Sequence, residues 1–182
     1  MNKLAIRDIN DGTSFLKDRV IFMEEDFDEY SCNEIKKQLL YLYSTKDKTK
    51  KITMYINSNG GSAEDFLMLY DLIKSAPCKI HTIGLGYACS AGALLLMVGD
   101  KRSAYKSAEI MVHGLSLGIG YKKLHSTEQY VKSARVTQGK IDDILIKHTN
   151  ITHATLEKYT KEDNFLTAEQ ALKLGIIDKV IG

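Results

Sequence analysis

The feature that most constrains the fold of this chain is a strand–turn–helix pattern that occurs twice in succession. In each copy an apolar strand leads through a turn of small residues into an apolar or amphipathic helix. We expect the strand, turn and helix at residues 52–57, 58–61 and 62–76 in the first copy, and at residues 79–83, 86–90 and 91–98 in the second. Strands that alternate with helices predict an α/β domain with parallel strands, and both turns then lie at the same end of the sheet.

Further expected elements on both sides extend this pattern within one domain. A chain of 182 residues is of ordinary size for a single domain. Residues 1–18 are polar and are expected to form a short N-terminal arm, and residues 19–182 form the domain. Its other expected elements are a strand at 19–23, a helix at 28–43, a strand at 109–113, a long helix at 122–149 that Gly139 interrupts, a short helix at 167–174 and a last strand at 176–181.

The composition argues against several classes of function. With a net charge of +2 and 26% charged residues, nothing favours a nucleic-acid or membrane partner. The longest apolar run, residues 91–98, is too short to span a bilayer, and the first residues lack the apolar core of a signal peptide. The three cysteines have no metal-like spacing and are odd in number, so we expect buried reduced thiols in a cytoplasmic protein and no metal site.

Ser90 is the polar residue that stands out in the second turn. It lies where the strand gives way to an apolar helix, so its hydroxyl is next to unpaired backbone N–H groups and the positive end of a helix dipole. A nucleophile that creates an oxyanion needs these surroundings. A serine in such a turn is more often a simple helix cap, and Ser90 alone does not decide between the two roles. The adjacent Cys89 is better explained as a small core residue than as a thiol nucleophile.

A serine nucleophile needs a base, an orienting acid and two N–H donors for the oxyanion. His113 ends the apolar strand at 109–113 and is the candidate base. Asp163 is the favoured acid, although periodicity alone does not choose it over Glu162 or Asp178. The Ala91 N–H follows the nucleophile directly. The second donor is expected from the first turn, where glycine allows close approach of the backbone, and Gly61 is favoured over its neighbour.

Several segments together resemble the ClpP family, the proteolytic subunits of the Clp protease, which are serine peptidases. The segment at 86–93 (GYACSAGA) resembles the family's nucleophile block G-x-A-A-S-M-G-A, and 55–62 (YINSNGGS) resembles its Y-I-N-S-P-G-G segment. The segment at 110–113 (IMVH) resembles I-M-I-H, and 162–168 (EDNFLTA) resembles R-D-x-F-L/M-S/T-A. Residues 16–22 (LKDRVIF) are similar to the family's first block. The order and spacing of these segments make the resemblance more specific than any one motif.

The resemblance covers about residues 17–182 and implies a fold, a chemistry and an assembly. The fold is the crotonase-like ββα superhelix, with a protruding helix–strand handle at about 114–149. The implied nucleophile, base and orienting acid are Ser90, His113 and Asp163, with Gly61 and Ala91 as oxyanion donors. Two stacked seven-membered rings would enclose the sites, and a hexameric AAA+ unfoldase would feed unfolded proteins to them. The chain itself would need no cofactor, because ATP would be used by the partner.

The departures from the family pattern keep other functions open. Ala91 replaces a methionine, Asn59 a proline, Gly114-Leu115 a glutamine–proline pair, and Glu162 an arginine. A serine endopeptidase is the first hypothesis. The alternatives are a structural or regulatory ring subunit with a misaligned triad, and a phage-type maturation protease that acts without an unfoldase. An acyl-CoA enzyme on the same general fold is a fourth hypothesis, and a remote one because such an enzyme needs no Ser–His pair.

Overall fold

The computed structural model of the chain describes residues 13–118, 120–121 and 123–182, and these residues form a mixed α/β fold around one sheet. Along the path β1–β2–β3–β4–β7 every pairing is parallel. Strand β5 also pairs in parallel with β3, and β6 joins β5 in antiparallel orientation. The strands are β1 (Val20–Met23), β2 (Ile52–Ser58), β3 (Ile80–Cys89), β4 (Lys101–Tyr105), β5 (Glu109–Val112), β6 (Asn164–Leu166) and β7 (Lys179–Ile181). The predicted α/β class is confirmed.

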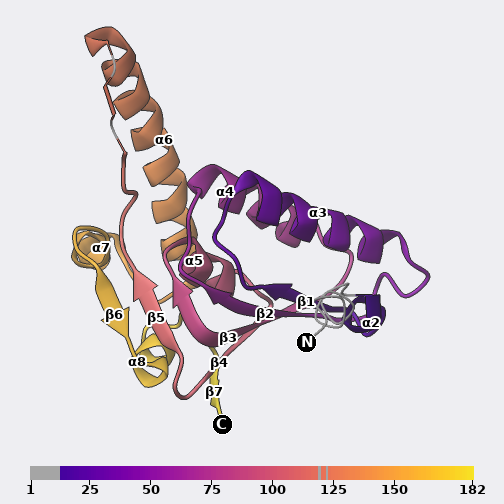
Figure 1. Cartoon of the computed structure of the whole chain (residues 1–182). Coiled ribbons are helices and arrows are strands. Elements are labelled where there is room, and N and C mark those ends of the chain that lie inside the picture. Colours follow the sequence, from indigo (N-terminus) through magenta and orange to yellow (C-terminus); the bar gives the residue numbers. More distant parts are fainter. Residues whose placement is uncertain (1–12, 119, 122) are drawn as a thin grey trace, which may run out of the picture.

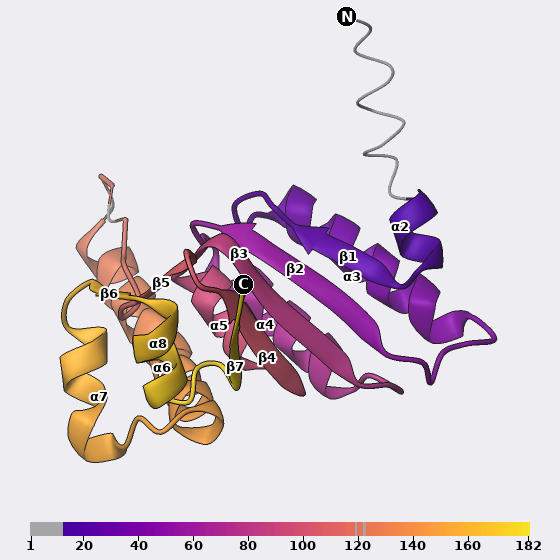
Figure 2. The same ribbon diagram turned by 90° about the horizontal axis from the view of Figure 1, so that it is seen from below.

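Some helices form a layer on one face of the sheet, and others form a second group near the edge that β5 and β6 make (Figures 1 and 2). Figures 1 and 2 show α3, α4 and α5 side by side on one face of β1–β4, while α7 and α8 lie with β6 at the other end. None of the described helices is long and apolar enough to cross a membrane. The helices are α2 (Thr13–Lys17), α3 (Glu29–Ser44), α4 (Ala63–Lys74), α5 (Ala91–Met97), α6 (Leu124–His148), α7 (His153–Thr160) and α8 (Ala168–Lys173).

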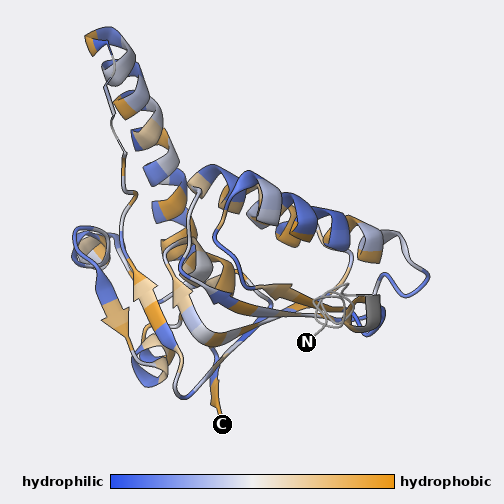
Figure 3. Cartoon of the chain, viewed as in Figure 1, coloured by the Kyte–Doolittle hydropathy of each residue, from blue (hydrophilic) through white to orange (hydrophobic). Residues whose placement is uncertain are grey.

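Hydrophobic patterning explains why these layers pack. In β2 the buried residues alternate with half-exposed ones, so Ile52, Met54 and Ile56 lie on the face that the helices cover. Figure 3 shows that the apolar sides of α3 and α4 face the sheet and their polar sides face outward. All seven residues of α5 are buried. The second helix of the repeated pattern therefore lies in the core, while the first lies partly at the surface.

The ends of the first helices follow local sequence signals. Asp28 caps α3 in a capping box with Ser31, and the Ser62 hydroxyl caps α4 by accepting the Asp65 N–H at 3.1 Å. Helix α4 ends shortly before Pro77, which disfavours a helical conformation in the residue before it. Both helices agree with the sequence prediction to within a few residues, because their signals are local.

The turn predicted at residues 86–90 is wrong, because β3 continues to Cys89. Gly86 has a φ of 75°, and the Tyr87 N–H donates to the Asn57 side chain at 2.9 Å, so the strand bends there. Beyond the bend β3 changes its neighbour from β4 to β5. A segment of small residues is therefore a strand here, because a distant strand supplies its hydrogen bonds.

Helix α6 is the long element that protrudes from the body of the chain (Figure 1). It passes through Gly139 without interruption, contrary to the sequence prediction. The helix begins at Leu124 and ends at His148, and residues 119 and 122 of the expected handle at 114–149 lie outside the described residues. The other residues between β5 and α6 form no strand, so among the described residues the handle consists of a helix beside an irregular segment.

Other differences from the prediction concern short elements. Strands β4 and β6 and helix α7 were not expected, and the last strand begins at Lys179 rather than at residue 176. Of the expected N-terminal arm, residues 1–12 lie outside the described residues, and Thr13–Lys17 form helix α2. Elements of three to eight residues carry little periodicity, so the sequence signal for them is weak.

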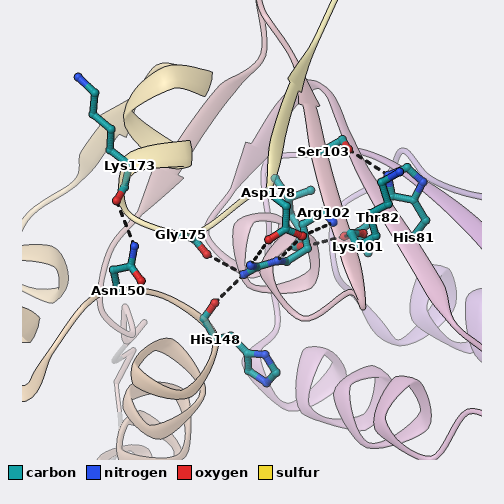
Figure 4. A network of polar contacts seen from close by, with 11 residues as sticks. His81, Thr82, Lys101, Arg102, Ser103, His148, Asn150, Lys173, Gly175 and Asp178 are labelled. Carbon is teal, nitrogen blue, oxygen red and sulfur yellow. Dashed lines mark hydrogen bonds and ion pairs between the residues drawn. The ribbon is translucent and has the colours of Figure 1, made fainter.

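An arginine on β4 fixes the base of α6 to the sheet (Figure 4). The Arg102 guanidinium donates to the carbonyl oxygens of His148 and Gly175, each at 2.6 Å, and forms an ion pair with Asp178. It thereby holds the last turn of α6, the chain after α8 and the start of β7 together. Arginine suits this position because its planar fork carries several donors in fixed directions. The C-terminal end of the protruding helix α6 is thus anchored to the sheet.

Candidate active site

Ser90 lies between β3 and α5, where its backbone is held in an unusual conformation. Its φ is 52° and its ψ is −120°, values that cost a non-glycine residue about 1–3 kcal/mol and that cluster at functional sites. The Ser90 N–H donates to the Met111 carbonyl of β5 at 2.8 Å, which holds the strained residue beside that strand. The hydroxyl makes no capping hydrogen bond to α5. The side chain is therefore free for a contact elsewhere.

The Ser90 hydroxyl contacts His113, and His113 contacts Asp163. The Nε2 of His113 lies 2.8 Å from the Ser90 Oγ, and its Nδ1 lies 3.0 Å from the Asp163 Oδ1. Strand pairing explains both contacts. Cys89 of β3 is opposite Met111 of β5, and the antiparallel register of β5 and β6 pairs Val112 with Asn164. The residue that follows Val112 is His113, and the residue that precedes Asn164 is Asp163. The pairing therefore places His113 between Ser90 and Asp163.

The structure also separates the three acidic candidates. Asp178 is engaged by Arg102 on β4, whose charge and hydrogen bonds lower the pKa of Asp178 even though burial opposes them (Figure 4). The hydrogen bond from the imidazole goes to Asp163 rather than to its exposed neighbour Glu162. The side chain of His113 is 21% exposed and that of Asp163 is 59% exposed. The imidazole is therefore sheltered, while the carboxylate lies open to solvent in the single chain.

Gly61 lines the same cleft as Ser90, and its N–H points away from the backbone of Phe27. Phe27 donates to the Gly60 carbonyl and accepts from the Ser62 N–H, both at 2.7 Å, in a parallel bridge opposite Gly61. In an extended segment the N–H of the middle residue points away from the strand that pairs with its two neighbours. A side chain at Gly61 would meet the Phe27 carbonyl oxygen at 2.4 Å, and the Gly61 φ is 141°. Only glycine fits there.

Ala91 supplies a second N–H beside the serine. It is the first residue of α5, and the first N–H groups of a helix have no partner within the helix. Gly61, Ser90, Ala91 and His113 line one cleft of about 290 Å³. The rest of its lining is mostly apolar and comprises Asn59, Ala63, Leu94, Met111, Gly114, Leu115, Ser116 and Ile141. The structure thus brings four of the five predicted site residues together at one cleft, and the fifth, Asp163, contacts His113 from outside that lining.

Cys89, the neighbour of the serine, is a core residue. It is 5% exposed, and burial raises the pKa of its thiol above the usual value. A thiol that stays protonated is a poor nucleophile. Among the described residues no group of three or more His, Cys, Asp or Glu side chains could hold a metal ion.

Sequence reasoning missed the backbone groups that build the site. The carbonyl of Met111 holds Ser90, and the backbone of Phe27 orients Gly61. It also missed Gln138 of α6, whose side chain accepts a hydrogen bond from Leu115 in the wall of the cleft. Main-chain acceptors leave no trace in the residue types of a sequence, so no signal could have found the first two.

Comparisons with known proteins agree with this geometry. A family model described as "Clp protease" matches residues 5–182. The "ATP-dependent Clp protease proteolytic subunit 2" of Corynebacterium efficiens is 37% identical over 168 residues, which cover 91% of this chain and 83% of that protein. The "ATP-dependent Clp protease proteolytic subunit 1" of Corynebacterium jeikeium is also 37% identical, over 91% of this chain and 88% of that protein. The resemblance and the fold class predicted from the sequence are confirmed.

Proposed function

This chain belongs to the Clp protease family and is a serine-type peptidase, and we propose that Ser90, His113 and Asp163 are its catalytic triad. The observation that carries the proposal is the pair of contacts at the imidazole, 2.8 Å to the Ser90 Oγ and 3.0 Å to the Asp163 Oδ1. A nucleophile, a base and an orienting group within hydrogen-bond reach of one another are the arrangement that acyl transfer requires.

In the proposed reaction the Ser90 oxygen attacks the carbonyl carbon of a peptide bond, and its proton passes to the Nε2 of His113. The tetrahedral intermediate then collapses to an acyl-enzyme, and the leaving amine takes that proton from the imidazole. Water attacks the ester in the second half, with His113 again as base. Asp163 accepts the Nδ1–H bond throughout, which keeps the Nε2 lone pair directed at the serine and stabilises the imidazolium.

The Gly61 and Ala91 N–H groups are proposed to stabilise the oxyanion. Both residues line the cleft with Ser90, and neither amide has an acceptor in the local backbone pairing described above. Preformed donors of this kind need no reorganisation when the charge develops, and losing one typically costs about 10²–10³ in kcat. The chemistry requires no cofactor on this chain.

We further propose that copies of this chain assemble into rings that enclose the active sites, and that an ATP-using unfoldase delivers substrates. The relatives' names describe ATP-dependent proteases, while this chain is proposed to hydrolyse peptide bonds without nucleotide. Enclosure would explain how a peptidase of broad specificity is tolerated among cellular proteins. The stacked seven-membered rings, the AAA+ partner and the cytoplasmic location stay predictions.

The contacts of His113 bear on the alternative functions. A regulatory ring subunit with a misaligned triad is disfavoured, because both imidazole nitrogens lie at hydrogen-bond distance from their partners. Nothing in the fold favours a maturation protease over an unfoldase-dependent one. Nucleotide-dependent binding of a purified AAA+ unfoldase would separate these two, since only the second requires the complex.

The proposed chemistry is tested by covalent labelling. A fluorophosphonate probe should modify Ser90 and stop hydrolysis of a fluorogenic peptide, with the modified residue identified by mass spectrometry. The His113→Ala variant should lose labelling, since the serine then lacks its base. Sedimentation of the same samples reports assembly. Fully assembled wild-type protein that takes no label would refute the proposal.

A further inference from the structure

The segment that follows His113 is held by two successive backbone amides. The Gly114 N–H donates to the Thr160 carbonyl at 2.9 Å, and the Leu115 N–H donates to the Gln138 Oε1 at 2.6 Å. A side chain at Gly114 would lie 2.4 Å from the Thr160 oxygen, so the segment packs closely against the C-terminal end of α7. The first amide is therefore fixed by backbone, but the second depends on one side chain of α6.

The Gln138 amide has its own orienting partner. Its Nε2 donates to the Asp142 Oδ1 at 2.6 Å, one helical turn further along α6. A backbone N–H can only donate and a carboxylate can only accept, so the two contacts fix which end of the amide faces Leu115. Both side chains are half-buried. The result is a relay of two hydrogen bonds, in which Asp142 orients the Gln138 amide and Gln138 accepts from the Leu115 backbone.

This relay acts on the wall of the cleft. His113, Leu115 and Ser116 all line the cleft that holds Ser90. Leu115 is half-buried, so its N–H loses stabilisation when no acceptor is present. Because α6 is rooted to the sheet through Arg102, a side chain from this helix is a fixed anchor for the wall.

We propose that Gln138, oriented by Asp142, is a positioning residue that fixes the wall of the substrate cleft at Leu115. The inference rests on the proposed peptidase function. Gln138 itself does not line the cleft and touches no reacting atom. Its effect is on where the wall lies when a peptide chain binds along it, and so on the binding of extended substrates rather than on the serine.

The first test is Gln138→Met, which keeps the length of the side chain and removes the acceptor. Losing one hydrogen bond of ordinary strength predicts a rise of about three- to tenfold in KM for an extended peptide. The kcat and the rate of fluorophosphonate labelling should stay within about twofold, because the probe reaches Ser90 without lying along the wall. Hydrogen exchange at the Leu115 amide should accelerate. An unchanged KM would overturn the inference.

A reversed pair gives the sharper test. Gln138→Glu keeps an acceptor for Leu115 but sets a carboxylate against Asp142, so its KM should rise as well. In the double variant Gln138→Glu/Asp142→Asn the introduced carboxylate accepts from both sides, so the KM and the Leu115 exchange rate should return to within about twofold of wild type. A residue with a merely structural role would not give this rescue. A double variant no better than Gln138→Glu contradicts the proposal.

The matched control is Gln129→Met, on the same helix. Gln129 is exposed, and its side-chain amide lies 3.2 Å from the His125 ring, far along the helix from the contact of Gln138 with Leu115, so KM and Leu115 exchange should not change. Sedimentation of each variant reports whether assembly is intact. If wild-type protein neither cleaves peptide nor takes label, the proposed function fails, and the exchange data alone then decide whether Gln138 holds the segment.

Discussion

The two strand–turn–helix units each place a serine at the start of a helix, but only one of the two hydroxyls caps its helix. Ser62 lies at the N-cap of α4 with φ −59°, and its hydroxyl accepts the Asp65 N–H. Ser90 lies at the N-cap of α5 with φ 52°, and its hydroxyl makes no cap but contacts His113 instead. The same residue at the same local position is a cap in one unit and a candidate nucleophile in the other.

The difference comes from what each turn is attached to. The first turn is held by the backbone of Phe27, which leaves Ser62 in an ordinary capping conformation. In the second unit, where the strand runs directly up to Ser90, the Met111 carbonyl of β5 accepts the Ser90 N–H and holds the residue in its strained conformation. In this conformation the Ser90 hydroxyl makes no capping bond to α5, and the first N–H groups of a helix have no partner within the helix. Giving up the cap therefore provides both the free oxygen and the donors beside it.

The largest expected effect separates the two serines by activity. Ser90→Ala should lower kcat for peptide hydrolysis on the order of 10⁶-fold, as removal of the nucleophile does in other serine triads. Its free energy of unfolding should change by less than about 0.5 kcal/mol, because no capping bond is lost. Peptide assays and urea unfolding measure the two quantities. A large loss of stability would mean that Ser90 is a structural residue after all.

The next prediction concerns the contact between the two turns. Gly60 has a φ of 101°, and a side chain there would lie 2.6 Å from the Ser90 Cβ and 2.9 Å from the Ala91 nitrogen. Gly60→Ala should therefore cost about 3 kcal/mol or more of unfolding free energy and disturb the nucleophile as well. Gly139→Ala is the control, since nothing lies within 4 Å of that position and the helix should be unharmed. Equal stability of the two variants would contradict this reasoning.

The substitution Ser62→Ala should have a smaller effect on stability, and it tests the serine that does cap its helix. The α4 cap is lost, so the free energy of unfolding should fall by about 1 kcal/mol. Ser62→Gly should cost only a few tenths, because a glycine leaves the end of the helix open to water. Thermal or urea unfolding measures the difference. Labelling at Ser90 should still occur at saturation in both variants; complete loss of labelling would mean that the two units are not separable.

A pH dependence of stability is expected where His148 of α6 contacts the first unit. The ring of His148 packs against Tyr70 of α4, with centroids 6.0 Å apart, and burial, followed by nearby cations, lowers its pKa from 6.5 to about 4. The unfolded chain takes up a proton near pH 6.5 and the folded one only near pH 4, so the free energy of unfolding falls as the pH drops through that window.

The check is a series of urea unfolding curves between pH 7 and pH 4. His148→Phe keeps a ring against Tyr70 and removes the titrating group, so the slope of stability against pH should decrease. The second unit carries a group of the same kind on β3, because burial also lowers the pKa of His81, so His148→Phe should reduce the slope without abolishing it. A slope that is equal in the variant would assign the acid sensitivity to other residues.

Much of the fold could be predicted because its signals are local. The apolar alternation of β2, the caps at Asp28 and Ser62 and the break before Pro77 are all read from neighbouring residues. The extension of β3 to Cys89 and the short strand β6 could not, because their hydrogen bonds come from β5, which is distant along the chain. Gly139 does not break α6, since the helical turns on both sides of it carry the helix through.

The sequence by itself determined the residue types of the candidate site and their order, through motifs that resemble one family. Periodicity and residue type alone did not determine which carboxylate faces His113. Asp163 and Asp178 are both acidic residues near short strands, but only the pairing of β6 with β5 brings Asp163 opposite the imidazole, while Asp178 is bound by Arg102. Nor could it tell a capping serine from one whose hydroxyl is free. Both outcomes depend on hydrogen bonds between segments far apart in the chain, and such bonds form only when the sheet is assembled.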